Sequence, residues 1–254
     1  MILFISDLHL CGARAEINGI FFDFLAGRAR KAEALYILGD LFEYWAGDDD
    51  LTAPFNAAVV RALAQCSAVT PVRLMHGNRD FLIGERFAAA AGVQLIADPT
   101  LTAINNTRTL LTHGDALCTD DIAYQQFRAE VRSPAWIGAF LANPLDARRK
   151  TITELREQSE REKRHKPEAI MDVNQGAVAS LLREHGYPRL VHGHTHRPAQ
   201  HVHSIDSRNC ERWVLADWYD HGSVLVCDGD EWRVEELGTG IQDSGFRRTP
   251  HSYR

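Results

Sequence analysis

The sequence predicts an α/β fold with layered sheets and an inserted helical segment. In the first 91 residues, short apolar runs alternate with longer stretches of helical periodicity, which is typical of α/β proteins. Each apolar run ends in polar or glycine-rich residues. After residue 200, short alternating segments indicate antiparallel strands. We therefore expect a first sheet with helices and a second, smaller sheet.

The first half supplies the strands and helices of the first sheet. Short apolar runs predict strands, and apolar residues at helical spacing between them predict helices. The expected strands span residues 2–6, 34–38 and 72–75, and the expected helices span 16–30, 54–66 and 85–91. In open α/β sheets the chemistry lies outside the carboxyl ends of the strands. The residues that follow these three strands are therefore candidates for a functional site.

The second half contains the insertion and the second sheet. Residues 101–112 predict a hairpin, 120–164 and 172–184 predict helices, and 189–191 predict a short strand. Residues 213–215, 223–227 and 232–237 predict antiparallel strands that close the second sheet. We expect a core of residues 1–119 and 168–237, a helical cap of residues 120–167, and a disordered tail of residues 238–254.

The composition excludes several classes of protein. With 45% hydrophobic and 24% charged residues, the chain is globular. A net charge of -6 disfavours a bulk nucleic-acid binder or a DNA-processing nuclease, since such proteins carry a strong basic balance. The five cysteines are scattered and form no CxxC pair, so reduced thiols of a cytosolic protein are expected. We expect neither a signal peptide nor a membrane span.

Seven potential metal ligands follow the predicted strands. They are Asp7, His9, Asp40, Asn78, His113, His194 and His196. Residues two apart in an extended segment share a face, so Asp7 and His9 point the same way, as do His194 and His196. Two such clusters facing each other can hold two cations about 3.5 to 4 Å apart. Asp40 follows a glycine that permits close approach of the backbone, and it is the natural bridging carboxylate. Each residue alone would suit a turn, but seven candidate ligands at successive strand ends together favour a metal centre.

These residues resemble, in order and spacing, the five motifs of the calcineurin-like metallophosphoesterases. The motifs are Asp7-x-His9, Gly39-Asp40-x-x-Glu43, Gly77-Asn78, His113-Gly114-Asp115 and Gly193-His194-x-His196. The resemblance implies a two-sheet sandwich flanked by helices. It also implies one metal held by Asp7, His9, Asp40 and His196, and another held by Asp40, Asn78, His113 and His194. Oxygen and nitrogen ligands favour two Mn²⁺ ions, with Fe, Zn and Mg as alternatives. Glu43 falls in a motif but is expected to support the site rather than bind metal.

Arg79 stands where many such enzymes have a histidine that protonates the leaving group. An arginine cannot act as an acid at cellular pH, because its pKa exceeds about 12. A phosphate monoester leaving from a diphosphate needs no proton, whereas an alkoxide does. Arg79 therefore indicates a pyrophosphate bond as the target, with the guanidinium clamping phosphate oxygens. The alternative is that Arg79 only anchors a surface carboxylate.

The predicted cap combines basic, polar and apolar residues. Asp121, Tyr124 and Ser159 would position a sugar or nucleotide, and Lys163 and Lys166 would offset diphosphate charge. The apolar Trp136, Ile137, Phe140 and Leu141 would receive acyl chains or, with Arg148, Arg149 and Lys150, meet an anionic membrane surface. The alternative is that the cap packs this apolar stripe on its own core.

A narrower resemblance extends from residue 1 to about residue 237. Stretches such as "HGNRDFLIG", "THGDALCTDD" and "VHGHTHRPA" are similar to the UDP-2,3-diacylglucosamine hydrolase family. That resemblance implies Mn²⁺-dependent hydrolysis of UDP-2,3-diacylglucosamine to 2,3-diacylglucosamine 1-phosphate (lipid X) and UMP in lipid A biosynthesis. It places the enzyme peripherally on the cytoplasmic side of the inner membrane, with no obligate protein partner. It maps substrate contacts onto Asn78, Arg79, Asp121, Ser159, Lys163, Lys166 and His194.

Two other functions fit the same motifs. The core could hydrolyse another nucleotide, such as a dinucleoside polyphosphate or a cyclic phosphodiester, which would need no acyl pocket. A scaffold that has become a protein-binding module is the other alternative. Such modules typically lose metal ligands, and this chain keeps a complete set.

Overall fold

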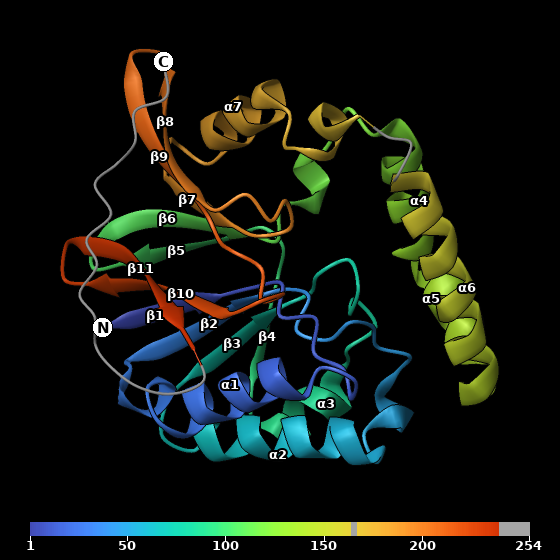
Figure 1. Cartoon of the computed structure of the whole chain (residues 1–254). Helices are drawn as coiled ribbons and strands as arrows, with labels where there is room; N and C mark the ends of the chain where they lie inside the picture. The colour runs from blue at the N-terminus through green and yellow to red at the C-terminus, as the bar shows by residue number, and fades with distance from the viewer. Residues whose placement is uncertain (164–166, 239–254) are drawn as a thin grey trace.

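The computed structural model describes residues 1–163 and 167–238, which form two mixed β-sheets packed face to face between helices (Figure 1). In spatial order, the first sheet contains β11 (Glu231–Leu237), β10 (Gly222–Asp228), β1 (Ile2–Ile5), β2 (Ala34–Leu38), β3 (Val72–Met75) and β4 (Gln94–Ile96). The second contains β5 (Thr100–Ile104), β6 (Thr107–Thr112), β7 (Arg189–His192), β9 (Arg208–Val214) and β8 (Ala199–Ile205). The expected disorder of the tail concerns residues 239–254, outside those described.

Helices cover the outer face of each sheet. The first sheet packs on α1 (Ala15–Ala26), α2 (Pro54–Ser67) and α3 (Glu85–Ala91), which lie together at the bottom of Figure 1. The second packs on α7 (Gln175–Glu184). Short 3₁₀ turns span Ala29–Lys31 (η1), Asp48–Asp50 (η2), Asp115–Leu117 (η3) and Glu168–Met171 (η4). The order of layers is therefore helix, sheet, sheet, helix.

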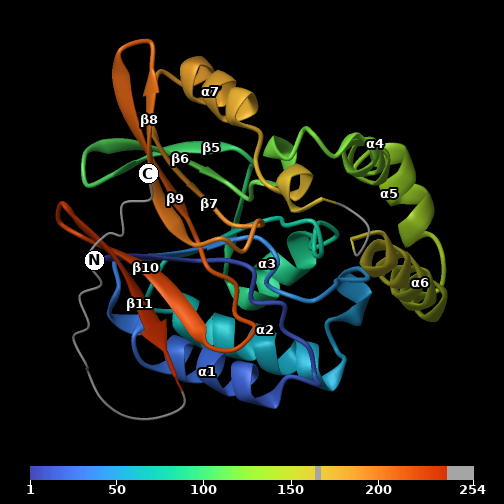
Figure 2. The same ribbon diagram turned by 45° about the horizontal axis from the view of Figure 1, so that its top comes forward.

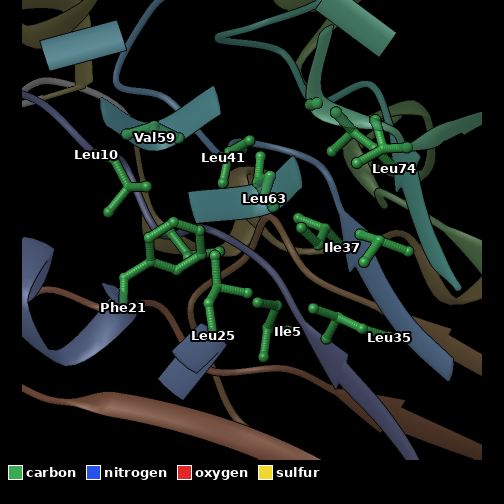
Figure 3. Close-up of a cluster of buried hydrophobic side chains, with 14 of the residues drawn as sticks. Ile5, Leu10, Phe21, Leu25, Leu35, Ile37, Leu41, Val59, Leu63 and Leu74 are labelled. Carbon is green, nitrogen blue, oxygen red and sulfur yellow. The ribbon is translucent and has the colours of Figure 1, made fainter. Parts of the chain in front are cut away.

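Successive side chains of a strand point to opposite faces of the first sheet, and buried apolar side chains cover both faces. In β1, Leu3 and Ile5 point to the helices, while Phe4 points between the sheets and stacks on Tyr36. Figure 3 shows the helix-side cluster, in which Ile5 lies with Phe21 of α1 and other apolar side chains. Burial of each such side chain contributes roughly 1.5 to 3 kcal/mol to stability. The sandwich implied by the resemblance is thus present.

Parallel pairing brings the expected strand ends to one edge. β1, β2, β3 and β4 run parallel in the first sheet, and β6, β7 and β9 run parallel in the second. Their carboxyl ends therefore meet on the same side of the sandwich. The loop after β1 is tied to the loop after β2, since the N–H groups of Asp7 and His9 donate to the carbonyls of Gly39 and Asp40.

The predicted sheet membership of the last two strands was wrong. Residues 223–227 and 232–237 do form strands, but β10 pairs antiparallel with β1, with Leu3 opposite Val226, and β11 pairs with β10. Both strands therefore belong to the first sheet. Their apolar pattern suits either sheet, so the sequence could not distinguish the partner. Strands β4 and β8 were not predicted.

Three helices occupy the segment expected to form the cap. They are α4 (Ile122–Val131), α5 (Pro134–Leu141) and α6 (Leu145–Lys163), and they lie together at one side of the sandwich in both views (Figures 1 and 2). Side-chain caps start two of them: Asp121 accepts from the Tyr124 N–H, and Ser133 accepts from the Trp136 N–H. Within the described residues, no helix is long and apolar enough to cross a membrane.

Ionic contacts attach α6 to the loop after β2. Arg148 is only 3% exposed, binds Asp49 and donates to the carbonyl of Ala46. Arg149 binds Asp50. The expectation that Arg148 faces an anionic membrane surface was therefore wrong, because its side chain is buried against the core, whereas Arg149 stays 37% exposed beside its contact with Asp50. Lys150 of the same run is 80% exposed.

Candidate metal centre

The predicted ligands lie on loops with an unusual backbone. Asp7, His9, Asp40, His194 and His196 all have positive φ angles, between 49° and 67°. Non-glycine residues seldom adopt this conformation, which is found mainly in turns and at functional sites. The loops are also packed too closely for side chains at their glycines. A Cβ at Gly77 would lie 2.0 Å from Oδ1 of Asp40.

One group of ligand atoms comes from the loops after β1 and β7. The Nε2 atom of His196 lies 3.2 Å from Oδ1 of Asp7 and 3.4 Å from Nε2 of His9. Oδ2 of Asp40 lies 3.9 Å from Nε2 of His9. The ligand atoms of Asp7, His9 and His196 all fall within 4.8 Å of one another. This arrangement can surround one cation.

A second group is adjacent and shares Asp40. Oδ1 of Asn78 lies 3.0 Å from Nε2 of His113 and 2.9 Å from Nδ1 of His194. Oδ1 of Asp40 lies 3.8 Å from Nε2 of His113. The two oxygens of Asp40 thus face the two groups, which is the geometry of a bridging carboxylate. The structure brings all seven sequence-predicted ligands together.

Burial and neighbouring charges perturb the titration of this cluster. Burial raises the pKa of Asp40 to about 7, with the charges of Asp80 and Asp7 adding to the rise and that of His113 opposing it. Burial and the His113 charge lower the pKa of His194 to about 3. Despite burial, hydrogen bonds to Asp217 and Asp7 raise the pKa of His196 to about 10. So many opposed ionisable groups in one buried cluster indicate a functional site.

The donor set fits two divalent cations. It offers carboxylate and amide oxygens and imidazole nitrogens, without a thiolate, which suits Mn²⁺, Fe, Zn or Mg rather than a soft metal. Nδ1 of His9 is buried and has no hydrogen-bond partner among the residues that the structure describes; it faces Glu43, 3.5 Å away, while Nε2 faces the centre. Glu43 lies behind His9, on the side away from the other ligands.

Known proteins match this chain over most of its length. A model of the family described as calcineurin-like phosphoesterase matches residues 1–198. A UDP-2,3-diacylglucosamine hydrolase of Aromatoleum aromaticum is 58% identical over 89% of this chain and 93% of its own length. The protein of the same name from Chromobacterium violaceum is 49% identical over 92% and 98%. The chain belongs to the calcineurin-like phosphoesterase family, in its UDP-2,3-diacylglucosamine hydrolase branch.

A cavity of about 580 Å³ leads from the metal ligands of this phosphoesterase to its cap. Asn78, Arg79, Asp121, Ser159 and His194, all predicted substrate contacts, line it. The side chain of Lys163 and the whole of Lys166 lie outside the described residues. Tyr124 also lines the cavity; its ring stacks on that of His194 with centroids 6.0 Å apart, and its hydroxyl donates to Asp115.

Part of the wall of the phosphoesterase cavity, beside charged cap residues such as Arg128 and Arg156, is apolar. Trp136 and Phe140 stack with centroids 4.6 Å apart and line it together with Phe81, Leu82 and Ile152. Phe140 is also part of the core cluster, and Ile137 packs against that cluster. The apolar stripe of α5 therefore does both: it packs on the core and forms a cavity wall.

Sequence reasoning missed two carboxylates of the phosphoesterase site. Asp80 is fully buried and accepts from the N–H groups of Gly77 and Leu41, at 2.8 and 2.7 Å. Asp217 lies 3.3 Å from Nδ1 of His196. Their positions in the sequence could have indicated both, because functional residues follow the carboxyl ends of strands. Asp80 closes the "HGNRD" turn after β3, and Asp217 follows the end of β9.

Proposed function

We propose that the chain hydrolyses the pyrophosphate bond of UDP-2,3-diacylglucosamine, giving 2,3-diacylglucosamine 1-phosphate (lipid X) and UMP in lipid A biosynthesis. The observation that carries this is one cavity with two unlike ends. A cluster of carboxylates and imidazoles forms one end, and an aromatic wall from the cap forms the other. A substrate with both a diphosphate and acyl chains matches both ends. The branch to which the chain belongs has the same activity in its name.

The residues of the centre have different roles in the proposed reaction. When bound, divalent cations lower the pKa of a water molecule and neutralise phosphate oxygens. Asp40 faces both ligand groups and fixes their separation. Its Oδ1 also accepts the backbone N–H of Arg79 at 2.8 Å, which anchors the residue that follows Asn78. Arg79 is thereby held at the cavity, where its guanidinium offsets the charge of the diphosphate.

The proposed reaction needs no separate general acid. A water molecule, as hydroxide, attacks the α-phosphorus, and the bond from this phosphorus to the bridging oxygen breaks. The sugar 1-phosphate departs with that oxygen as an anion that is stable at neutral pH. Arg79 supplies a fixed guanidinium charge rather than a proton, and it interacts more strongly as charge builds on the phosphate oxygens. Tyr124, Asp121 and Ser159 line the cavity beyond the centre and would orient the sugar or nucleotide.

We further propose two Mn²⁺ ions per chain and a peripheral position on the cytoplasmic side of the inner membrane. Two adjacent ligand groups, each facing one oxygen of Asp40, support the number of ions. Ile122, Phe127 and Leu141 of the cap are 67%, 42% and 39% exposed, which supports contact of the cap with a lipid surface. The substrate itself is the expected lipid partner, and neither nucleic acid nor an obligate protein partner is expected.

The test compares three substrates with purified protein and Mn²⁺: UDP-2,3-diacylglucosamine, its deacylated UDP-sugar and a generic phosphodiester. We expect the acylated diphosphate to be turned over preferentially and to release UMP. Comparable turnover of all three would contradict the lipid-specific function and favour a general nucleotide phosphoesterase. Asp7→Ala and His196→Ala are expected to abolish turnover while the far-UV circular dichroism spectrum stays unchanged.

Sedimentation with vesicles tests the membrane position. We expect the protein to bind vesicles containing anionic lipid, and the substitution Ile122→Ser with Phe127→Ser to reduce the bound fraction. The substitution Val69→Ser is the matched control, because Val69 is 55% exposed but lies after α2, away from the cap. Equal binding by all three proteins would contradict docking through the cap.

A further inference from the structure

The histidines of the two ligand groups have different supports behind their rings. In the first group, Nδ1 of His196 lies 3.3 Å from Oδ2 of Asp217, and Nδ1 of His9 lies 3.5 Å from Oε2 of Glu43. In the second group, Nδ1 of His113 lies 2.8 Å from the backbone carbonyl of Leu38, whereas Nδ1 of His194 faces the centre beside Oδ1 of Asn78. A carboxylate therefore lies next to the rear nitrogen of each histidine of the first group, while a backbone carbonyl lies behind His113 of the second.

Asp217 is held in place independently of His196. The N–H of the next residue, Trp218, donates to the carbonyl of Asp7 at 3.0 Å, and the buried Trp218 ring donates from Nε1 to the carbonyl of Ser223. Arg14 binds the carbonyls of Trp218 and Tyr219 and also those of Leu8 and His9. One arginine thus joins the loop that carries His9 to the segment that carries Asp217.

The position of Asp217 determines which nitrogen of His196 carries a proton. A carboxylate next to Nδ1 favours the tautomer with the proton on Nδ1, which leaves the lone pair of Nε2 free. That Nε2 atom is the one that lies 3.2 Å from Asp7 and 3.4 Å from Nε2 of His9. A carboxylate in this place also makes the imidazole a stronger ligand, and its loss typically costs about 10 to 100-fold in metal affinity.

We propose that Asp217 is a positioning residue that orients His196 and makes the position formed by Asp7, His9 and His196 the tighter of the two cation sites. The inference rests on the proposed two-metal centre, and it adds the order in which the two sites bind their cations. Glu43, 3.5 Å from Nδ1 of His9 and paired with Arg156, adds negative charge next to the same position. The position formed by Asn78, His113 and His194 fills second, since a backbone carbonyl rather than a carboxylate lies behind His113.

The first test is calorimetric titration of metal-free protein with Mn²⁺. We expect two binding steps in the parent chain, and a loss of about 10 to 100-fold in the tighter step alone for Asp217→Ala, with a smaller loss for Asp217→Asn. Asp206→Asn is the matched control: this carboxylate lies in the turn between β8 and β9 and binds Arg183 and Tyr187. Unchanged binding in both Asp217 variants, or equal weakening of both steps, would overturn the inference.

A second readout separates orientation from folding. In ¹⁵N-histidine NMR spectra of the Zn²⁺-loaded protein, His196 is expected to carry its proton on Nδ1, and Asp217→Ala is expected to alter the shifts of this ring but not those of His113. An identical His196 tautomer and shift in the variant would contradict the role of Asp217. Two-step Mn²⁺ binding without hydrolysis of the lipid substrate would instead refute the proposed function and leave the order of filling intact.

Discussion

At the scale of single residues, Asp80 connects the loop that carries Asp40 to the loop that carries Asn78. Its carboxylate accepts from backbone N–H groups of both loops, at Gly77 and at Leu41, with Asp40 and Phe42 at longer distances of 3.3 and 3.4 Å. The side chain is fully buried, so water cannot replace it. Both ligand-bearing loops therefore depend on one carboxylate.

Replacing Asp80 with alanine is expected to lower the free energy of unfolding by about 3 kcal/mol or more. The substitution leaves several buried N–H groups without an acceptor, each at a cost of roughly 1 to 3 kcal/mol. Urea denaturation of metal-free protein measures the change. Asp80→Asn retains one acceptor oxygen and should lower the free energy of unfolding by less. The same urea midpoint for the alanine variant and the parent would contradict this role.

Arg79 is expected to act on the transition state of a diphosphate rather than on protonation. Arg79→Gln should lower kcat/KM for UDP-2,3-diacylglucosamine by about 10² to 10³-fold, the typical loss for one stabilising donor. Arg79→Lys should retain only part of the kcat/KM that Arg79→Gln loses, since a lysine lacks the planar pair of N–H donors of a guanidinium. Arg79→His is the decisive variant. Faster diphosphate hydrolysis with histidine would mean that the leaving group does need a proton.

The seven ligands could be predicted because their signal is local: each follows an apolar strand that pairs in parallel with a neighbour. Asp80 and Asp217 obey the same rule but were missed, since a carboxylate that binds backbone N–H groups or an imidazole looks, in sequence, like any turn residue. Arg148 was misread for a related reason. Its neighbours Arg149 and Lys150 form a basic run, and only the fold shows that Asp49 lies opposite.

At the scale of elements, the cap is attached to the core at both ends. Asp115, which follows the loop after β6, accepts from the hydroxyl of Tyr124 and the guanidinium of Arg128, both at 2.8 Å, and so holds α4. At the other end, Arg148 and Arg156 of α6 bind Asp49 and Glu43. These contacts make the cap a fixed wall of the cavity.

Weakening one attachment should expose the cap to proteolysis. Arg148→Met keeps the aliphatic stem but removes the bonds to Asp49 and to the carbonyls of Ala46 and Asn143. We expect a loss on the order of 2 kcal/mol and faster chymotryptic cleavage between α5 and α6. Lys150→Met is the matched control, because that lysine is 80% exposed. Equal cleavage rates in the two variants would show that Arg148 does not hold the cap.

The elements of the first half were predictable, and the partners of the last strands were not. Helical and strand periodicities differ enough in residues 1–91 to be separated along the chain. β10 is buried throughout apart from Asp228, and its apolar side chains would fit between strands of either sheet. Pairing with β1 depends on contacts between residues far apart in sequence, which no local pattern reports.

At the scale of the whole molecule, the metal centre joins the two sheets. Asp7, Asp40 and Asn78 follow strands of the first sheet, while His113, His194 and His196 follow strands of the second. A cation bound by both sets cross-links the sandwich. Its binding free energy therefore adds to the stability of the entire fold.

Removal of metal should lower thermal stability. Mn²⁺ at about 100 times its dissociation constant is expected to add about 2.7 kcal/mol to the free energy of unfolding. Scanning calorimetry with EDTA and then with excess Mn²⁺ measures the shift in Tm. The substitution Asp40→Ala removes the shared ligand, so the Tm of this variant should rise much less when Mn²⁺ is added. An equal response to Mn²⁺ in that variant, or retained activity, would contradict a centre bridged by Asp40.

The pairing of β1 with β10 has a consequence for synthesis on the ribosome. β1 emerges first, and β2 can pair with one of its edges early, but its other edge stays open until more than two hundred further residues have been translated. An apolar strand with a free edge can pair with the wrong chain. Nascent chains of this protein therefore need protection until β10 emerges, and truncation before residue 222 should yield aggregates rather than a smaller folded enzyme.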